Sequence, residues 1–432
     1  MAHTAELIAV GTELLLGNIA NTNAQFLSRE LNALGINVYR HTVVGDNPQR
    51  LRQAVEEART RADLILTTGG LGPTYDDLTK ETVCAVFDRP LVLREDLLEQ
   101  IERIYRTVLH RPMPESDRRQ AELPRGAVAF ENHTGTAPGF AFDAYGCHVV
   151  MLPGPPIECR SVWEHGARDD LRRFSDGVIV SRDIMTFGLG ESAVEALLHS
   201  RMCAMRNPSL ATYAKPSEVC LQATARAADP AAAQRMLDPV EREVRQALGE
   251  LVYGVDVADL AEACLRLLNE RGLSFACAES CTGGLIAQRI TALPGASAVF
   301  RGGVVSYWSA VKASLLGVPQ ALLEREGAVS APVAEAMAQG VRERTGADLA
   351  VSVTGVAGPD RDERDNPVGR VFVALCAADG TRFCRHLELG RRSREQIREA
   401  ASNHAFDLIR RYLTKLPLEQ ADPAKWTAPT LS

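Results

Sequence analysis

A serine three residues ahead of a glycine pair is the group in this sequence best suited to nucleophilic chemistry. Residues 277–284 read Cys-Ala-Glu-Ser-Cys-Thr-Gly-Gly, so Ser280 follows the apolar run 273–278 and precedes a stretch with helical spacing. A hydroxyl on such a strand-to-helix turn is exposed, and the free N–H groups of the first helical turn can stabilise an oxyanion or a phosphate. Serine is also a common helix cap. The local sequence therefore predicts either a nucleophile or a cap.

Two downstream segments of the same region carry groups that could assist a serine. Tyr307 and Lys312 lie where an apolar strand passes into a helix, and Thr354 with Gly355 ends another apolar strand. A lysine that is partly desolvated has a lowered pKa and can accept the serine proton, whereas a lysine on an exposed helix face cannot. Both readings of Lys312 stay open. The Thr354 hydroxyl is a further candidate donor, and three strand ends at one edge of a sheet favour a pocket there.

A glycine-rich loop near the N-terminus suggests a second site, for phosphate. Residues 67–77 read Thr-Thr-Gly-Gly-Leu-Gly-Pro-Thr-Tyr-Asp-Asp after the apolar strand 63–68. Ligands bind at the carboxyl ends of strands in open α/β sheets, where backbone N–H groups suit phosphate. The glycines expected to cradle it are Gly69, Gly70 and Gly72.

The two carboxylates that close this loop, Asp76 and Asp77, are oxygen ligands of the kind that Mg²⁺ takes. Thr12 and Glu13, after the first strand, and residues 153–156, after a later one, are expected to open on the same edge. The alternative is a glycine turn followed by an aspartate that caps the next helix.

The elements that must position these groups alternate between strand and helix. The first region predicts an α/β domain with a largely parallel sheet, whose strands are 7–10, 37–44 and 63–68 and whose helices are 21–34 and 47–60. A short βαββα segment from 178 to about 253 follows, with no catalytic signature. A second α/β unit then predicts the strands 273–278, 303–307, 349–353, 371–376 and 383–389, the last two joined by an Asp379-Gly380 hairpin turn. The expected domains are 1–172, a small α+β (KH-like) middle domain at 177–253, 256–415, and a tail at 416–432.

Length and composition exclude several classes of protein. The 432 residues are too many for one core, and 46% apolar with 24% charged residues is typical of a globular protein. A net charge of -7 argues against direct nucleic-acid binding. The sequence shows no signal peptide or membrane span, which predicts a cytoplasmic protein. Its ten cysteines lack zinc-site spacing, and even the closest pair, Cys277 and Cys281, is expected to be free.

The N-terminal motifs resemble the CinA family, competence/damage-inducible protein A. The resemblance covers essentially the whole chain and rests here on residues 8–17, 68–77, 135–139 and 152–156. It implies a first domain similar to the molybdopterin-binding fold of molybdenum-cofactor biosynthesis proteins. It also implies a pyrophosphatase that cleaves ADP-ribose-like nucleotides with Mg²⁺ or a related cation. On that reading the three loop glycines hold phosphate, while Asp77, with Asp76 as a further candidate, holds the metal. Pterin binding by the same loops is the competing assignment.

The C-terminal motifs resemble the CinA C-terminal domain, known as nicotinamide-nucleotide amidase. That resemblance implies hydrolysis of nicotinamide mononucleotide to nicotinate mononucleotide and ammonia, in pyridine-nucleotide salvage, with no cofactor. Ser280 would then attack the carboxamide carbon, and Lys312 with Tyr307 would move protons. The oxyanion would be held by the backbone of Thr282, Gly283 and Gly284, and the nucleotide phosphate by Arg394 and Arg398. Members of the family resemble proteins that self-associate, which predicts a homo-oligomer, most simply a dimer.

The chain departs from the family pattern after Gly358-Pro359. Residues 360–365 read Asp-Arg-Asp-Glu-Arg-Asp where a glycine-rich segment is usual, Ser309 stands for asparagine, and Arg370 stands for a small hydroxyl residue. An acidic loop beside a phosphorylated substrate is expected to repel it. Two alternatives to a bifunctional hydrolase therefore stay open: a protein with a degenerate amidase domain, and a pterin-binding or nucleotide-binding interaction protein.

Overall fold

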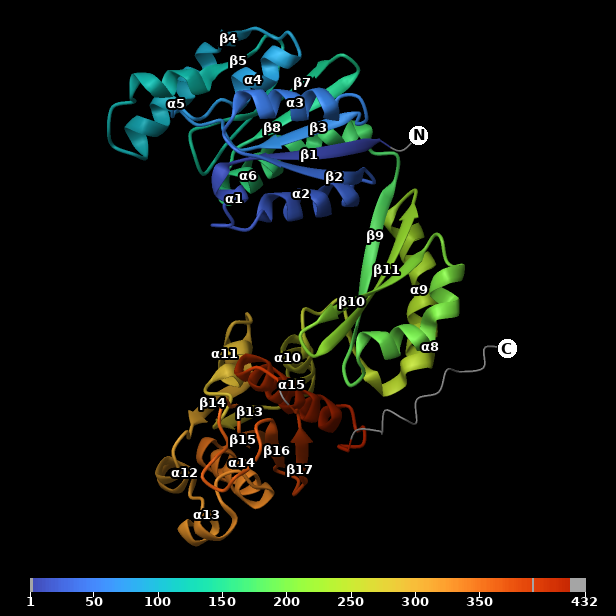
Figure 1. Cartoon of the computed structure of the whole chain (residues 1–432), viewed down its shortest axis with the longest axis vertical. Helices are drawn as coiled ribbons and strands as arrows, with labels where there is room; N and C mark the ends of the chain where they lie inside the picture. Colours follow the sequence, from blue (N-terminus) through green and yellow to red (C-terminus); the bar gives the residue numbers. More distant parts are fainter. Residues whose placement is uncertain (1–2, 391, 420–432) are drawn as a thin grey trace. The chain divides into compact units, whose positions relative to one another are not determined.

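A computed structural model describes residues 3–390 and 392–419 of the chain (Figure 1). It forms two compact units, Met1–Val180 with Ala225–Arg235, and Ser181–Thr224 with Met236–Ser432. The ten cysteines are free, as their spacing predicts. No helix among the described residues combines the length and apolar character needed to cross a membrane.

The N-terminal domain is built on a six-stranded sheet in the order β2-β1-β3-β8-β7-β6. The first four strands in that order pair in parallel, and β7 and β6 add antiparallel pairs at one side. This arrangement confirms the α/β fold class. The strands are β1 Thr4–Val10, β2 Asn37–Val44, β3 Leu64–Thr68, β6 Val128–Phe130, β7 Gly139–Ala144 and β8 Cys147–Leu152, and a separate pair joins β4 Leu91–Leu93 to β5 Glu122–Pro124.

Helices cover both faces of this sheet because its central strands are apolar on both sides. Ile8 and Val10 of β1 belong to one buried cluster, and the alternating Leu7 belongs to another on the opposite face. The first cluster packs under α3 Pro48–Ala58 and α4 Thr79–Val86, and the second under α2 Thr22–Ala33 and α6 Pro156–Val162 (Figure 1). The remaining helices of the domain are α1 Thr12–Leu15, η1 Glu115–Ala121, α5 Glu95–Thr107, η2 Trp163–Ala167, α7 Arg168–Leu171 and η3 Arg172–Phe174.

Local signals fix where these helices begin. The Asn21 side chain caps α2 by accepting from the N–H of Ala24, and Asn47 caps α3 by accepting from the N–H of Arg50, with Pro48 as the first helical residue. The predicted helices at 21–34 and 47–60 are therefore confirmed, with ends shifted by one or two residues. Both start beyond the carboxyl end of a strand, which leaves the preceding loops at the edge where β1, β3 and β8 end.

The middle segment folds as the predicted βαββα pattern with one more strand. Its four-stranded sheet has the order β10-β11-β9-β12. The elements are β9 Val178–Thr186, α8 Glu191–Ala204, β10 Ser209–Lys215, β11 Glu218–Ala227, α9 Pro230–Leu248, η4 Gly249–Leu251 and β12 Val252–Val255. The sequence prediction ended at about residue 253 and missed β12, because a four-residue strand carries too little periodicity to be recognised.

The C-terminal domain has a five-stranded sheet in the order β14-β13-β15-β16-β17. The strands are β13 Phe275–Glu279, β14 Phe300–Val305, β15 Leu349–Gly355, β16 Arg370–Ala377 and β17 Arg382–Glu388. The first three strands in the order are parallel and the last two pairings are antiparallel, with a turn at Asp379 and Gly380 as predicted. Its helices are α10 Leu260–Arg271, α11 Leu285–Thr291, η5 Ala296–Ala298, α12 Ser309–Leu316, α13 Gln320–Glu326, α14 Ala331–Thr345 and α15 Arg394–Leu413.

Candidate functional site

Ser280 lies in the turn between β13 and α11, one residue beyond the strand. Its N–H donates to the carbonyl of Val353 at 2.9 Å, and its own carbonyl accepts from the N–H of Gly283 at 3.1 Å. Gly283 and Gly284 have φ angles of 60° and 95°, a left-handed region that favours glycine. The N-cap of α11 is Gly284, with no side-chain cap hydrogen bond. Ser280 is therefore not the cap of α11, and its hydroxyl is available for another role.

Lys312 contacts the Ser280 hydroxyl directly. It lies on the first turn of α12 with 1% of its surface exposed, and its Nζ is 3.0 Å from Ser280 Oγ and 2.6 Å from the carbonyl oxygen of Ser306. Burial lowers the pKa of the Lys312 amine to about 8. Of the two alternatives for Lys312, the structure therefore supports the desolvated lysine and not the exposed one. A substantial fraction of its amine is neutral near physiological pH.

Tyr307 and Thr354 lie nearby, but neither hydroxyl bonds to Ser280. The half-exposed Tyr307 accepts a hydrogen bond from Arg394 Nη2 at 2.8 Å, while the buried Thr354 donates to the carbonyl of Ala328 at 2.7 Å. Gly355, the last residue of β15, faces β16 so closely that a Cβ there would lie 2.7 Å from the carbonyl oxygen of Arg370. Thr354 and Gly355 therefore hold the end of β15 in place beside Ser280.

Glu279 occupies the N-terminus of α11, a role that the sequence prediction missed. Its carboxylate is 1% exposed and accepts from the N–H groups of Gly284 at 3.0 Å, Ile286 at 3.1 Å and Ala287 at 3.0 Å. Both glycine N–H groups predicted to serve an oxyanion thus have partners in this structure, since that of Gly283 donates to the carbonyl of Ser280 and that of Gly284 to Glu279. An acidic residue at a strand end just before a helix was the available signal.

Thr282 keeps unused hydrogen-bonding groups at this turn. Its N–H donates to no group in the described part of the chain. Its hydroxyl and that of Ser306 are buried and likewise have no hydrogen-bond partner there. Buried polar groups without partners are rare in folded proteins and costly, so these hydroxyls are candidates to contact a ligand.

The two predicted phosphate-binding arginines behave differently. Arg398 donates from Nε and Nη2 to the carbonyl of Thr282, at 3.2 and 2.8 Å, and so holds the Ser280 turn rather than standing free for a phosphate. Arg394 bonds Tyr307 and the carbonyl of Gly358, and it lines a cavity of about 760 Å³. The other residues of that cavity are Ala357, Gly358, Pro359, Arg361, Pro367, Val368, Glu388, Gly390, Arg392 and Ser393.

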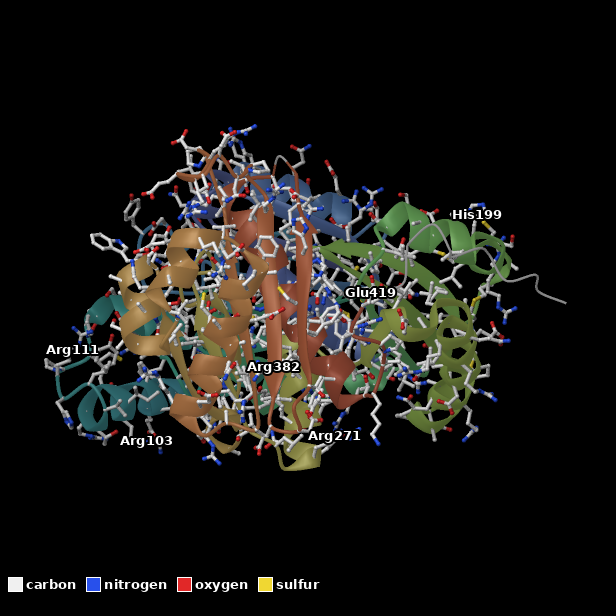
Figure 2. The ribbon with its side chains drawn as sticks, turned by 90° about the horizontal axis from the view of Figure 1, so that it is seen from below. Arg103, Arg111, His199, Arg271, Arg382 and Glu419 are labelled. Carbon is white, nitrogen blue, oxygen red and sulfur yellow. The ribbon has the colours of Figure 1, made fainter. Side chains whose placement is uncertain are left out.

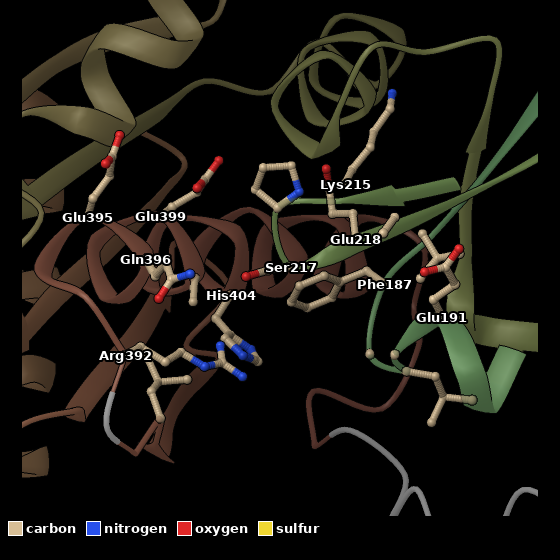
Figure 3. Close-up of a pocket in the computed structure, with 18 residues that line it drawn as sticks. Phe187, Glu191, Lys215, Ser217, Glu218, Arg392, Glu395, Gln396, Glu399 and His404 are labelled. Carbon is tan, nitrogen blue, oxygen red and sulfur yellow. The ribbon is translucent and has the colours of Figure 1, made fainter. Parts of the chain in front are cut away.

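A separate cavity of about 720 Å³ contains none of the predicted site residues (Figure 3). It is lined by the start of α8, the turn between β10 and β11, and α15, and it shares Arg392 with the cavity beside Arg394. Burial and the nearby Arg385 and Arg392 lower the pKa of His404 in its wall to about 3, so that imidazole is neutral. Burial also raises the pKa of Glu218 to about 7.

The N-terminal loops meet in a cavity of about 520 Å³ at the carboxyl ends of β1, β3 and β8. Two glycines permit the close approach. A Cβ on Gly69 would lie 2.2 Å from the carbonyl oxygen of Val10, and one on Gly70 would lie 1.9 Å from Thr79 Oγ1. The three loops therefore converge at this edge of the sheet, as predicted. The residues that line the cavity are Val10, Gly11, Glu13, Ile19, Asp46, Gly69–Asp77 without Tyr75, Gln120, Thr136, Ala137, Pro153–Pro156 and Glu158.

Asp76 and Asp77 face the Thr74 hydroxyl, which lies 2.5 and 2.6 Å from one oxygen of each. That hydrogen bond lowers the pKa of the Asp76 carboxyl. Gly72 leaves room for the second carboxylate, since a Cβ there would lie 2.4 Å from Asp77 Oδ2. Arg119 holds the loop from outside the cavity, donating to the carbonyls of Thr74 and Asp77.

The charge of this cavity was not foreseen. Glu13, Asp46 and Glu158 join the two loop aspartates, and no lysine or arginine lines it. Burial raises the pKa of Glu158. Thr12, expected with Glu13 to open on this edge as a substrate-binding residue, bonds Asp46 Oδ2 through its hydroxyl at 2.6 Å and does not line the cavity. Within the described ranges, no three His, Cys, Asp or Glu side chains form a ready-made metal site.

Each of three segments of the chain matches a known family of domains. Residues 6–173 match a probable molybdopterin binding domain, residues 181–254 the damage-inducible protein CinA KH domain, and residues 257–413 the CinA C-terminal domain. A "Putative competence-damage inducible protein" of Symbiobacterium thermophilum is 47% identical over 95% of this chain and 98% of its own length. The chain belongs to the CinA family. A Geobacillus kaustophilus protein of the same name is 50% identical over 86% of this chain and 90% of its own.

Solved CinA-family structures match part of the chain. Competence/damage inducible protein CihA from Agrobacterium tumefaciens is 38% identical, over 36% of this chain and 93% of that one, with a TM-score of 0.35. The protein CinA from Thermoplasma acidophilum is 34% identical, over 39% and 98%, with a TM-score of 0.36. The family models and the curated relatives confirm the recognition of the family, and Ser280 and Lys312 lie within the segment that matches the CinA C-terminal domain.

Proposed function

We propose that the C-terminal domain is a serine amidase that converts nicotinamide mononucleotide to nicotinate mononucleotide and ammonia. The observation that supports it most is the buried contact of 3.0 Å between Lys312 Nζ and Ser280 Oγ, together with the lowered lysine pKa. A buried amine of this kind can remove the proton of a neighbouring hydroxyl near neutral pH.

The reaction runs in two halves on this pair. Neutral Lys312 takes the Ser280 proton while Oγ bonds to the carboxamide carbon, and the carbonyl oxygen becomes an oxyanion. Lys312 then returns the proton to the leaving nitrogen, the C–N bond breaks, and ammonia departs from an ester on Ser280. Water, deprotonated by Lys312, hydrolyses that ester and restores the serine. The N–H and hydroxyl of Thr282, which have no other partner in the described residues, serve as oxyanion donors.

Ammonia release tests the amidase proposal. Purified full-length protein incubated with nicotinamide mononucleotide should release ammonia and nicotinate mononucleotide in equal amounts. Ser280→Ala should abolish release, while Ser314→Ala, an exposed serine on α12, should leave it unchanged. Release at the wild-type rate by Ser280→Ala would refute the assignment of the nucleophile, and no release by the unmodified protein would refute the activity.

We further propose that the N-terminal domain is a pyrophosphatase for ADP-ribose-like nucleotides that needs a divalent cation. The cavity has five lining carboxylates and no lining cation, so a diphosphate would be repelled unless metal ions neutralise it. Carboxylate oxygens fit Mg²⁺, which is commonly held by one or two carboxylates together with substrate phosphates. Asp77 and Asp76 would hold the ion, which would polarise the diphosphate. The glycine loop would receive the phosphates, since no side chain separates its backbone from them.

Metal-dependent release of AMP from ADP-ribose tests this second activity. It should require Mg²⁺, stop in EDTA, and fall steeply in Asp77→Ala but not in Glu99→Ala, an exposed carboxylate on α5. Full activity of Asp77→Ala would place the metal elsewhere. Saturable calorimetric binding of a molybdopterin analogue, without any nucleotide cleavage, would favour the pterin assignment instead.

A further inference from the structure

A buried asparagine organises the loop between β6 and β7, which borders the N-terminal cavity. Asn132 is 5% exposed, and its Oδ1 accepts from the N–H and hydroxyl of Thr134 and from the N–H of Gly135, at 2.9 to 3.2 Å. Its Nδ2 donates to the carbonyl of Ala137 at 2.9 Å and to Glu158 Oε2 at 2.7 Å. The loop is thus folded around one side chain, which also reaches the Glu158 carboxylate.

Glu158 occupies a space that only a glycine leaves open. It lies on the first turn of α6 and is half-buried, and it lines the cavity. A Cβ on Gly135 would lie 2.1 Å from Glu158 Oε2, which is closer than two non-bonded heavy atoms can approach. Its other oxygen, Oε1, has no hydrogen-bond partner in the described part of the chain. The motif segment 135–139 therefore has a structural reason at its first residue, because Gly135 makes room for this carboxylate.

Glu158 differs from the other four carboxylates of the cavity. Three of them are exposed, namely Glu13, Asp46 and Asp76. Asp77 accepts from both the N–H and the hydroxyl of Thr74, and the same hydroxyl lowers the pKa of the Asp76 carboxyl. Burial instead raises the pKa of Glu158, and the Asn132 hydrogen bond offsets part of that rise. A carboxylate whose pKa is raised is a better proton acceptor than one whose pKa is lowered.

Charged groups on the elements beside Glu158 have other partners. His133, in the loop before β7, lies 2.9 Å from Glu131 through its Nε2, and the Arg160 guanidinium of α6 lies over the Phe26 ring at 4.8 Å. Burial and one neutral hydrogen bond therefore set the pKa of Glu158, without help from a neighbouring cation.

We propose that Glu158 is the general base of the diphosphate cleavage in the N-terminal domain and that Asn132 positions it. The inference rests on the proposed pyrophosphatase function. Glu158 Oε1 takes a proton from water while the water oxygen bonds to one phosphorus of the diphosphate. The bond from that phosphorus to the bridging oxygen breaks, and the bridging oxygen leaves with the other phosphate. ADP-ribose and water thus give AMP and ribose 5-phosphate, and Glu158 then releases its proton to solvent.

The kinetic test follows AMP release from ADP-ribose by full-length protein at saturating Mg²⁺, across a range of acidic to alkaline pH. The wild-type rate should fall at low pH, because a protonated Glu158 cannot accept a proton. Glu158→Gln keeps the shape of the side chain and should lower kcat about 10²- to 10⁴-fold, remove that fall, and leave KM and the Mg²⁺ concentration at half-maximal rate unchanged. An unchanged kcat would overturn the proposal. A raised Mg²⁺ requirement would also overturn it, since Glu158 would then be a metal ligand.

Two variants of exposed residues in the same domain serve as controls. Glu164→Gln makes the same chemical change on η2, and Arg103→Gln changes the charge of α5 (Figure 2). Both should keep the wild-type rate and pH profile. A loss in either control equal to that of Glu158→Gln would mean that the effect comes from net charge or folding, and would overturn the assignment.

Asn132→Asp tests the positioning role. It keeps the size of the side chain but replaces the donor that faces Glu158 by a second carboxylate, which should raise the pKa of Glu158. The fall in rate at acidic pH should therefore move to higher pH. A slower enzyme whose pH profile has not moved would show that Asn132 only supports the loop, and would overturn its positioning of the base.

A binding measurement separates failure of this inference from failure of the pyrophosphatase proposal. Wild type and Glu158→Gln are titrated calorimetrically, in Mg²⁺, with an ADP-ribose analogue that has a methylene in place of the bridging oxygen. Equal affinity with a large difference in kcat supports the base. Weaker binding by the variant would assign Glu158 to substrate binding and overturn it. No AMP release by wild type would refute both proposals, whereas release at the same rate by both proteins would refute the base alone.

Discussion

The buried Lys312 amine should make ammonia release depend steeply on pH. With a pKa of about 8, about a quarter of this lysine is neutral at pH 7.5, whereas an ordinary lysine would be about 0.1% neutral. Burial thus raises the concentration of free base about 200-fold at that pH. The rate at saturating substrate should rise about tenfold per pH unit well below pH 8 and level off above about pH 9.

Replacing Lys312 by methionine removes the base but keeps an apolar chain of similar length. We expect kcat to fall by about 10²- to 10⁴-fold, and the remaining rate to lose its step near pH 8. The assay is ammonia release under saturating nicotinamide mononucleotide from pH 6.5 to 9.5. A wild-type profile that is flat over this range, or a step that persists in Lys312→Met, would refute the view that this amine is the base.

The same lysine should leave a signature in stability. Its pKa is lower in the folded chain than in the unfolded chain, so the unfolded chain binds more protons between about pH 8 and pH 10.5. The free energy of unfolding should therefore rise through this window, by about 3 kcal/mol from this group. Urea denaturation of the Lys312→Met variant should lack that rise. An identical pH dependence in both proteins would mean that Lys312 is not desolvated.

Three further substitutions test the supporting structure. Gly70→Ala should lower the free energy of unfolding of the N-terminal domain by more than Gly126→Ala does. Both glycines have positive φ, but only a Cβ at Gly70 would clash, at 1.9 Å from Thr79 Oγ1. In urea titration the control Gly126→Ala should lower the free energy of unfolding by about 1–2 kcal/mol. Glu279→Gln, which weakens three hydrogen bonds at α11, should cost about 1–2 kcal/mol and slow ammonia release. Asp407→Asn should cost about 3–5 kcal/mol in thermal unfolding, because Arg385 and Arg410 then lose their buried counter-charge.

The sequence was sufficient to predict which residues stand at strand ends. In a parallel sheet the carboxyl ends of neighbouring strands meet at one edge, so Ser280 and Lys312, which lie 32 positions apart in the chain, could be expected together. The five strands of the C-terminal domain follow from apolar runs bounded by turn residues, and four of them were predicted to within two residues at each end. The exception, β14, begins three residues earlier than predicted, since its glycines carry no periodicity.

The direction of individual side chains could not be predicted in the same way. Arg398 has the helical spacing of an exposed basic face, yet it turns inward to the carbonyl of Thr282 because that buried acceptor needs a donor. Glu279 turns back over α11 because the first N–H groups of a helix lack partners within the helix. The orientations of both side chains depend on which backbone group without a partner lies near them in the folded protein. The spacing of residues in the sequence does not contain that information.

Two of the cavities differ in the charge of their lining. The N-terminal cavity places five carboxylates and no lysine or arginine around a glycine loop, which is why the proposed diphosphate cleavage there requires an added metal ion. The cavity beside Arg394 instead places three arginines around Glu388, which Arg370 already bonds. The loop 360–365 satisfies only part of its own charge. Asp362 accepts from the N–H groups of Arg364 and Asn366, and Asp365 pairs with Arg361, whereas Asp360 and Glu363 are exposed. Of these six residues only Arg361 lines the cavity, so the charge that a cavity presents depends on which side chains face it and not on the net charge of the loop beside it.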